Sequence, residues 1–208
     1  MTQDGAESGN AADSEYPVAA FTLRPAKAQY AEPMRRLACA AYQRYVSRIG
    51  QEPAPMRRDY ASVVARADAW LAERAGELLG FVVCERAVDH LLVESIAVAP
   101  KWQGLGIGGA LLGLAERRAR AAGLSQIRLY TNEAMTENLA YYPRHGYRET
   151  HRGIEDGYRR VYFTKVIDLA DEDHSRARER IPVTGEGRSG LPAGVVVGED
   201  DPGGVQPL

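Results

Sequence analysis

The chain contains 208 residues, of which 45% are hydrophobic and 8% aromatic, and its formal net charge at pH 7 is −2. A charge so close to zero gives no electrostatic attraction for nucleic acid or for an anionic membrane, so neither partner is expected. No apolar run approaches the roughly 20 residues that a membrane-spanning helix needs. Cys39 and Cys84 lack the spacing of metal ligands, which predicts buried free thiols and no metal site.

The two ends of the chain differ in composition from its middle. Residues 1–17 are small, polar and acidic and lack the regions of a secretory signal, so we expect a disordered N-terminal tail and a cytoplasmic protein. Residues 170–208 are first highly charged and then rich in Gly and Pro, which predicts a disordered C-terminal tail. The apolar cluster at 195–197 leaves open that this tail docks on the body or on a partner. One domain, residues 18–169, remains between the tails.

The first part of this domain is predicted to form a strand and two helices. Residues 18–26 indicate a strand that ends at a proline. From Lys27 to Gly50, apolar residues recur every three or four positions, the pattern of an amphipathic helix. Two prolines make residues 51–56 a loop, and a weaker periodicity indicates a shorter helix at 58–69.

The middle of the domain changes to a pattern of strands. Three aliphatic and β-branched runs with short connections predict an antiparallel meander over residues 69–74, 78–87 and 90–99. A helix that ends at Gly123 follows, and then a strand over residues 126–131. Because a strand, a helix and a strand in this order form a βαβ unit, the strands at 90–99 and 126–131 should be parallel, with a right-handed crossover.

The last part of the domain is predicted to be a short helix and a hairpin. The helix covers residues 136–145 and is followed by Gly146. The hairpin pairs residues 147–152 with 158–167 around a turn at 153–157. This alternation of strands and helices predicts an α/β domain.

Four glycines gather at the start of the long helix: Gly104, Gly106, Gly108 and Gly109. They let a ligand approach the backbone, and the first amides of the helix form an anion site suited to a pyrophosphate. Three of them also satisfy the dinucleotide pattern G-x-G-x-x-G, but that pattern belongs after the first strand of a parallel sheet and before an acidic residue that ends the next strand. Neither condition holds well here. Tight packing of strand and helix stays open as an alternative role.

A different pattern fits these glycines better. Gln103, Gly106 and Gly108 form Q-x-x-G-x-G after a strand that ends in V-A-P, which resembles the acetyl-CoA-binding signature of the GCN5-related N-acetyltransferases (GNAT). Tyr142, four residues before Gly146 in G-Y, resembles a second motif of that superfamily. The order of elements is similar over most of the chain. The resemblance implies an α/β (α+β) fold with a central mixed, mostly antiparallel sheet, flanked by helices, in which one parallel strand pair splays apart.

The resemblance also implies the site residues, with acetyl-CoA as co-substrate and no metal. Pantetheine would bind in the splayed gap to the backbone of Ile96, Ala97 and Val98. The pyrophosphate would bind to the amides of Gln103, Gly104, Leu105, Gly106, Ile107, Gly108, Gly109 and Ala110. Asn132 would line the cleft, although turn formation alone also explains it, and Asn138 is the nearest match to an Asn of the second motif. Tyr142 would be the general acid for the departing thiolate.

Acetyl transfer to an amine also calls for a base. An alkyl ammonium with a pKa near 10.4 is only about one part in 10³ neutral at pH 7, so a group that removes its proton is useful. Glu94, on the strand before the glycines, is the first candidate. His90, four residues earlier, is expected on the same face and could share or replace that role. A proton-relaying water is a third possibility.

The sequence therefore predicts an acetyl-CoA-dependent N-acetyltransferase that acts by direct attack in a ternary complex. The acceptor is a primary amine, on a small molecule, a peptide or a protein, and the chain is a monomer or a homodimer. One alternative is a non-catalytic acyl-CoA-binding or sensing module on the same fold, in which Tyr142 would be dispensable. A nicotinamide-binding oxidoreductase is a third hypothesis.

Overall fold

The computed structural model describes residues 21–169 and 195–196. Its strands are β1 (Thr22–Pro25), β2 (Ala69–Arg74), β3 (Glu77–Arg86), β4 (Leu91–Val98), β5 (Gln126–Asn132), β6 (Arg148–Glu155), β7 (Tyr158–Val166) and β8 (Val195–Val196). Its α-helices are α1 (Ala31–Ile49), α2 (Tyr60–Ala65), α3 (Ile107–Ala121) and α4 (Thr136–Arg144). Among the described residues, three 3₁₀ turns precede or join these helices, η1 (Ala28–Tyr30), η2 (Ala54–Met56) and η3 (Pro100–Trp102).

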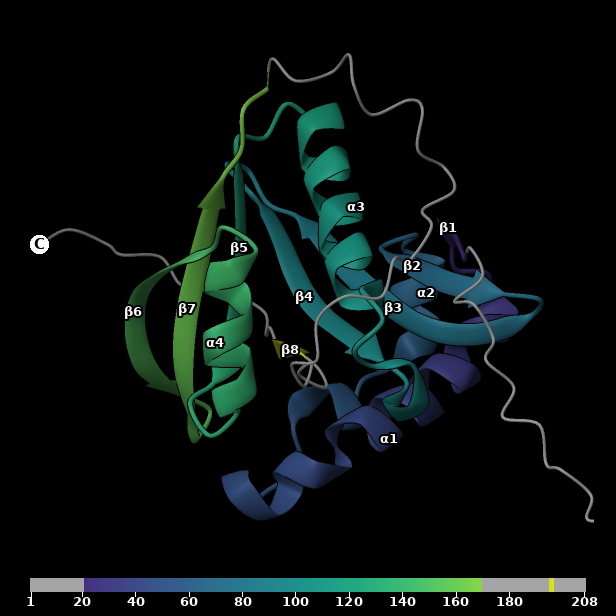
Figure 1. Cartoon of the computed structure of the whole chain (residues 1–208), viewed down its shortest axis with the longest axis horizontal. Helices are drawn as coiled ribbons and strands as arrows, with labels where there is room; N and C mark the ends of the chain where they lie inside the picture. The colour runs from purple at the N-terminus through teal and green to yellow at the C-terminus, as the bar shows by residue number, and fades with distance from the viewer. Residues whose placement is uncertain (1–20, 170–194, 197–208) are drawn as a thin grey trace, which may run out of the picture.

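All the described strands belong to one sheet (Figure 1). Its order is β1-β2-β3-β4-β5-β7-β6, and β8 pairs with β4. The pair β4–β5 is parallel, and every other pairing is antiparallel. The predicted meander, the parallel βαβ pair and the mixed, mostly antiparallel sheet are therefore confirmed.

The helices cover both faces of the sheet (Figure 1). Gly80 and Phe81 are neighbours on β3, so they face opposite sides. Gly80 lies against Ile107 and Leu111 of α3, whereas the ring of Phe81 packs edge-on against Tyr60 of α2, with 5.3 Å between centroids. The helices α2 and α3 thus pack on opposite faces, and α1 packs beside α2.

Close packing at Gly80 leads to a testable prediction. A Cβ added to Gly80 would lie 2.7 Å from the backbone oxygen of Ala97, and Gly80 is paired with Val98, so β4 cannot move away without loss of pairing. We expect Gly80→Ala to lower the free energy of unfolding by about 1–3 kcal/mol, as overpacking does. Urea denaturation followed by circular dichroism measures this change.

The control for Gly80 is a glycine in a helix with space around it. A Cβ added to Gly113 of α3 would meet only the end of the Arg117 side chain, at 3.7 Å. Because alanine is the better helix former, Gly113→Ala is expected to leave the protein equally stable or to stabilise it by about 0.5–1 kcal/mol. Equal effects of both substitutions would contradict the packing role of Gly80.

A β-bulge separates the two halves of β4. Cys84 of β3 is opposite Val93 and Val83 is opposite Ser95, so Glu94 is the extra residue of the bulge. Bulges increase local twist and bend the strand that carries them. Beyond the bulge, β4 is not paired with β5, because their parallel ladder contains only Leu91↔Ile127 and Leu92↔Arg128. The splayed pair that the family resemblance implied is present.

Two local predictions were wrong in extent. The second helix starts later than expected, since the carboxylate of Asp59 accepts hydrogen bonds from Ala61 N and Ser62 N and so caps α2. The hairpin turn is shorter than 153–157 and consists of Asp156 and Gly157, both with positive φ, 49° and 79°. Asp-Gly is a preferred pair for a two-residue hairpin turn, so the three residues before it continue β6.

The predictions for the two tails fall mostly outside the described residues, as do residues 18–20 of the first strand. Val195 and Val196 are described and form β8, opposite Ile96 and Ser95 of β4 respectively. The strand β8 also contacts β5. For these two residues, docking on the body of the protein is what the structure shows.

Candidate active site

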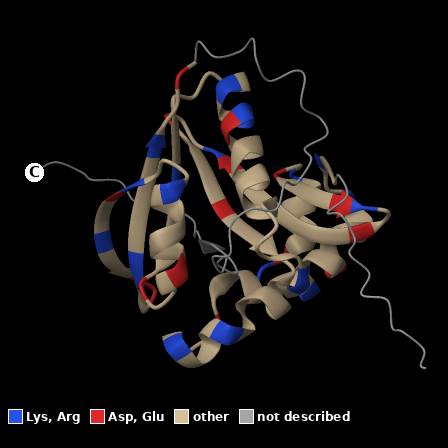
Figure 2. Ribbon diagram, in the orientation of Figure 1, with Lys and Arg blue, Asp and Glu red and all other residues tan. Residues whose placement is uncertain are grey.

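The candidate site lies where β4 and β5 separate. In Figure 1 the two strands run side by side at one end and apart at the other, with β8 in the opening. The only charged residue of β4 is Glu94, and Figure 2 shows this strand mostly in tan. The backbone of β4 at Ser95 and Ile96 pairs with β8 rather than with β5. The edge of β4 that β5 leaves unpaired can therefore form backbone hydrogen bonds with an extended segment, as it does with β8.

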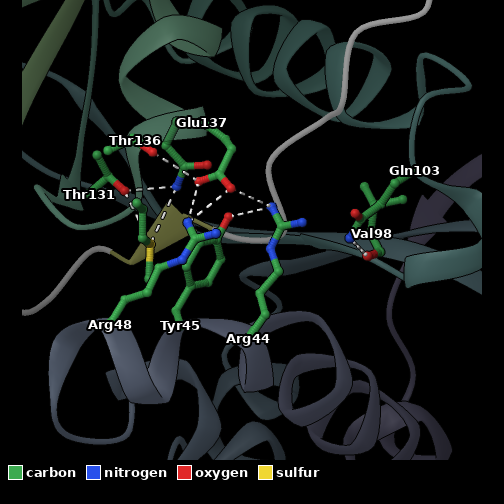
Figure 3. A network of polar contacts seen from close by, with 10 residues as sticks. Arg44, Tyr45, Arg48, Val98, Gln103, Thr131, Thr136 and Glu137 are labelled. Carbon is green, nitrogen blue, oxygen red and sulfur yellow. Dashed lines mark hydrogen bonds and ion pairs between the residues drawn. The ribbon is translucent and has the colours of Figure 1, made fainter.

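The far end of β4 is held by two side-chain donors. The hydroxyl of Tyr42 in α1 donates to the carbonyl of Ile96, at 3.2 Å. Gln103 Nε2 donates to the carbonyl of Val98, at 3.0 Å (Figure 3). Both bonds fix the backbone that the family resemblance assigned to pantetheine, and for Tyr42 the sequence predicted only a place within the helix over residues 27–50.

The glycines at the start of α3 have two separate roles. Gly104 and Gly106 have φ values of 86° and 78°, which side chains rarely adopt, and Gly106 is the N-cap of α3. Gly108 and Gly109 face α4, since an added Cβ would lie 2.7 Å from Tyr141 Oη and 3.0 Å from His145 Nε2. Tight packing thus explains Gly108 and Gly109. Gly104 and Gly106 instead form a turn that leads to the first amides of α3, which have no partner within the helix.

Tyr142 lies inside the protein, on α4. Its side chain is fully buried, and its ring contacts those of Tyr147 and Phe163, with centroids 5.9 and 5.4 Å apart. Burial, reinforced by the phenols of Tyr141, Tyr147 and Tyr45, raises the pKa of Tyr142 well above its ordinary value. The phenol therefore keeps its proton at neutral pH. Pro143 directly follows it, yet α4 continues to Arg144.

Glu94 is a buried carboxylate with one charged partner. Its side chain is 2% exposed and forms an ion pair with Arg58, which lies just before α2. Arg58 contacts Oε1, while Oε2 has no hydrogen-bond partner in the part of the chain that the structure describes. A buried oxygen without a partner is costly unless a ligand satisfies it. Sequence reasoning missed Arg58, because a partner 36 positions away leaves no local pattern.

The structure does not bring His90 and Glu94 together. His90 precedes β4, and its Nδ1 lies 2.6 Å from the carboxylate of Asp89, which also binds Arg128. At about 3.3 Å per residue, four residues of strand separate the two positions by about 13 Å. His90 thus lies at the closed, paired end of β4, and Glu94 lies where the strands separate.

The two asparagines lie at the end of β5 and on α4. Asn132 Oδ1 accepts a hydrogen bond from Ala134 N at 2.9 Å, which stabilises the turn. Asn138 is fully buried, and its Nδ2 donates to Thr131 Oγ1 at 2.8 Å. The turn role thus accounts for the side chain of Asn132, and Asn138 joins α4 to β5.

An ionic bridge connects α1 and α4 (Figure 3). Arg48 of α1 contacts both carboxylate oxygens of Glu137 in α4 at 2.9 Å, and Arg44 lies 3.8 Å from the same carboxylate. Arg44 also donates to the hydroxyl of Tyr45 at 2.6 Å. This bridge fixes α4, and Tyr142 with it, relative to α1. No motif in the sequence indicated it.

Comparison with known proteins identifies the fold. A sequence profile described as the acetyltransferase (GNAT) family matches residues 31–147, more than half of the chain. The chain belongs to the GNAT acetyltransferase family. It is a transferase of the acyltransferase class, and acetyl-CoA is its co-substrate.

Solved structures share the GNAT fold at low sequence identity. Ard1 from Thermoplasma volcanium is 16% identical, with a TM-score of 0.60 over 71% of this chain and 97% of its own. The PaiA N-acetyltransferase from Thermoplasma acidophilum, in complex with coenzyme A, is 17% identical, with a TM-score of 0.60 over 70% and 98%. The ribosomal-protein-S18-alanine N-acetyltransferase from Escherichia coli is 17% identical, with a TM-score of 0.54 over 74% and 97%. These likenesses concern the fold.

Two further findings describe this GNAT acetyltransferase. Within residues 21–169 and 195–196, no group of three or more His, Cys, Asp or Glu side chains is arranged to hold a metal ion. The helices of the same residues include none long and apolar enough to cross a membrane. Of the two free thiols, Cys84 is buried as predicted, whereas Cys39 is half-buried.

Proposed function

We propose that this GNAT protein is an N-acetyltransferase that transfers the acetyl group of acetyl-CoA to a primary amine by direct attack in a ternary complex. The observation that carries the proposal is Glu94, a buried, ion-paired carboxylate with an unpartnered oxygen at the point where β4 and β5 separate. A buried carboxylate is unfavourable for stability alone, so a role in binding and deprotonating an amine accounts for its position.

Acetyl-CoA would bind between the separated strands and at the start of α3. Pantetheine has amide groups, and the edge of β4 at Ile96, Ala97 and Val98, which β5 does not pair, offers backbone partners for them. The pairing of β8 with this edge supports that fit. The turn at Gly104 and Gly106 and the first amides of α3 would hold the pyrophosphate.

In the proposed reaction, Glu94 and Tyr142 handle the protons. Glu94 Oε2 accepts a proton from the acceptor ammonium, and the neutral nitrogen forms a C–N bond at the thioester carbonyl carbon while the C–S bond breaks. The hydroxyl of Tyr142 donates its proton to the departing sulfur, and the second proton that the nitrogen loses as the amide forms restores the phenol of Tyr142 through solvent. An acyl-enzyme is not proposed, because burial raises the pKa of the Cys84 thiol to about 12 and keeps it a poor nucleophile.

The structure favours Glu94 over His90 as the base, since His90 lies at the paired end of β4 against Asp89. The family assignment leaves no support for a nicotinamide-binding oxidoreductase. A non-catalytic acyl-CoA-binding module stays the alternative, and it would need neither Glu94 nor Tyr142. The cytoplasmic location and the monomeric or homodimeric state stay predictions.

A thiol-release assay tests the proposal. The purified chain is incubated with acetyl-CoA and panels of small amines, amino acids, polyamines, aminoglycosides and peptides with free N-termini. Release of coenzyme A that depends on one acceptor class, with the acetylated product found by mass spectrometry, is the expected result. Tight acetyl-CoA binding with no acceptor-dependent release from any panel would instead support the sensing module.

The pairing of β8 predicts competition with acetyl-CoA. Because β8 pairs with the edge proposed for pantetheine, the cofactor binds only to molecules from which β8 has left this edge. The apparent affinity for the cofactor is therefore lower when fewer molecules have the edge unoccupied. We expect the double variant Val195→Pro/Val196→Pro, which lacks the amide donors of β8, to bind coenzyme A up to about tenfold more tightly by calorimetry. Val205→Pro is the control, and equal affinity in all three proteins would contradict the competition.

A further inference from the structure

Two consecutive arginines connect the segment between α1 and α2 to different strands of the sheet. Arg57 Nη2 donates to the hydroxyl of Tyr158 on β7, at 3.0 Å. Arg58 pairs with Glu94 on β4. Tyr158 in turn donates to the backbone oxygen of Glu52, at 2.7 Å, in the same segment. The segment is thus attached to β7 and β4, which lie on the two sides of the gap.

Unlike Arg57, Arg58 also affects a buried charge, because its partner is the buried carboxylate of Glu94. The side chain of Glu94 is 2% exposed and that of Arg58 is 20% exposed. Burial without a cation would favour the neutral acid form of Glu94, which has a proton where the acceptor needs a lone pair. The guanidinium contacts Oε1, a contact that favours the charged carboxylate, and Oε2 has no hydrogen-bond partner among the described residues.

The other polar side chains that the neighbouring helices bring close to Glu94 include two buried phenols. The neighbouring helices contribute the phenols of Tyr42 from α1, which donates to Ile96 of β4, and Tyr60 from α2, and burial raises the pKa of both. Asp59, next to Arg58 in the chain, is exposed and caps α2 through Ala61 and Ser62. The facing stretch of β3 is apolar. Among the described residues, Arg58 is therefore the charged side chain that forms an ion pair with Glu94.

We propose that Arg58 is the positioning residue for Glu94: it holds the buried carboxylate in its charged form and leaves Oε2 directed to the acceptor amine. The inference rests on the proposed function, because the acceptor amine belongs to it. It adds a residue of the segment between the first two helices to the apparatus of acetyl transfer. Arg57 serves as a natural comparison, since it attaches the same segment without contact with Glu94.

The first test is independent of activity. The full chain is labelled with ¹³C at the glutamate carboxyls, the Glu94 signal is assigned by its loss in Glu94→Gln, and its titration is followed by NMR without substrate. Arg58→Met should raise the titration midpoint of Glu94 by about 1–2 pH units. Arg58→Lys should return the midpoint most of the way to its wild-type value, and Arg57→Met should leave it unchanged. An unchanged midpoint in Arg58→Met, or an equal shift in Arg57→Met, would overturn the inference.

The second test is the pH profile of kcat/KM with the best amine from the screen. The acidic limb reports protonation of the base in the free enzyme, so Arg58→Met should move it to higher pH by the same amount, and Arg57→Met should not move it. If the NMR midpoint shifts while the limb stays in place, Arg58 controls the charge of Glu94 but Glu94 is not the base. That result would reject the proposed function of Glu94 and, with it, the positioning of an acceptor.

Discussion

Glu94→Gln is expected to lower kcat/KM for the amine acceptor by about 10²-fold or more at pH 7, in the range measured for the loss of a general base. Glutamine keeps the size of the side chain but cannot accept the ammonium proton. The neutral fraction of the amine, about one part in 10³ at pH 7 for a pKa near 10.4, would then limit the rate. Steady-state thiol release with saturating acetyl-CoA measures the effect.

The sign of the pH dependence gives a sharper form of this prediction. In the variant, kcat/KM should rise about tenfold per pH unit toward the pKa of the amine, because only bulk solvent supplies the neutral form. An acceptor of lower pKa, already neutral at pH 7, should show a smaller defect. Glu85→Gln on β3 is the matched control and should keep wild-type rates. A defect in Glu94→Gln that is equal for amines of high and low pKa would exclude proton removal as the role of Glu94.

The sequence predicted the fold well where local chemistry decides it. Gly50 ends the first helix with a φ of 83°, the strands of the meander lie within one residue of their predicted bounds, and α3 is followed by Gly123 as expected. In each case turn residues and hydrophobic periodicity agree. The hairpin turn was misplaced because two glycines around an acidic pair offered more than one turn, and strand pairing selected Asp156 and Gly157.

The parts of the site that belong to short sequence motifs were predictable. The glycine turn and Tyr142 are read from short spacings, but the β-bulge at Glu94 depends on register with β3, and that register is a property of the sheet. The prediction that His90 and Glu94 share a face assumed an uninterrupted strand, and the bulge at Glu94 interrupts it. Contacts between distant segments, such as Arg58 with Glu94 and Arg48 with Glu137, have no local sequence signal at all.

Tyr142→Phe is the second substitution with a large expected effect. Phenylalanine keeps the ring contacts with Tyr147 and Phe163, so the stability of α4 and the KM for acetyl-CoA should change little. The hydroxyl proton is lost, and a departing thiolate would have no donor beside it. We expect kcat to fall by about 10²-fold, or about 2.7 kcal/mol of transition-state stabilisation.

Tyr141→Phe provides the matched control, because Tyr141 is the adjacent residue on the same helix. It is also buried, and its hydroxyl has no hydrogen-bond partner among the described residues. Loss of that hydroxyl removes no hydrogen bond to a described residue, so the kcat of Tyr141→Phe should stay at the wild-type level. If Tyr142→Phe also retained full turnover, the proton would have to come from water. A thioester with a more acidic thiol separates these cases further, since it needs less help from a donor and should reduce the defect of Tyr142→Phe only if the hydroxyl acts on the sulfur.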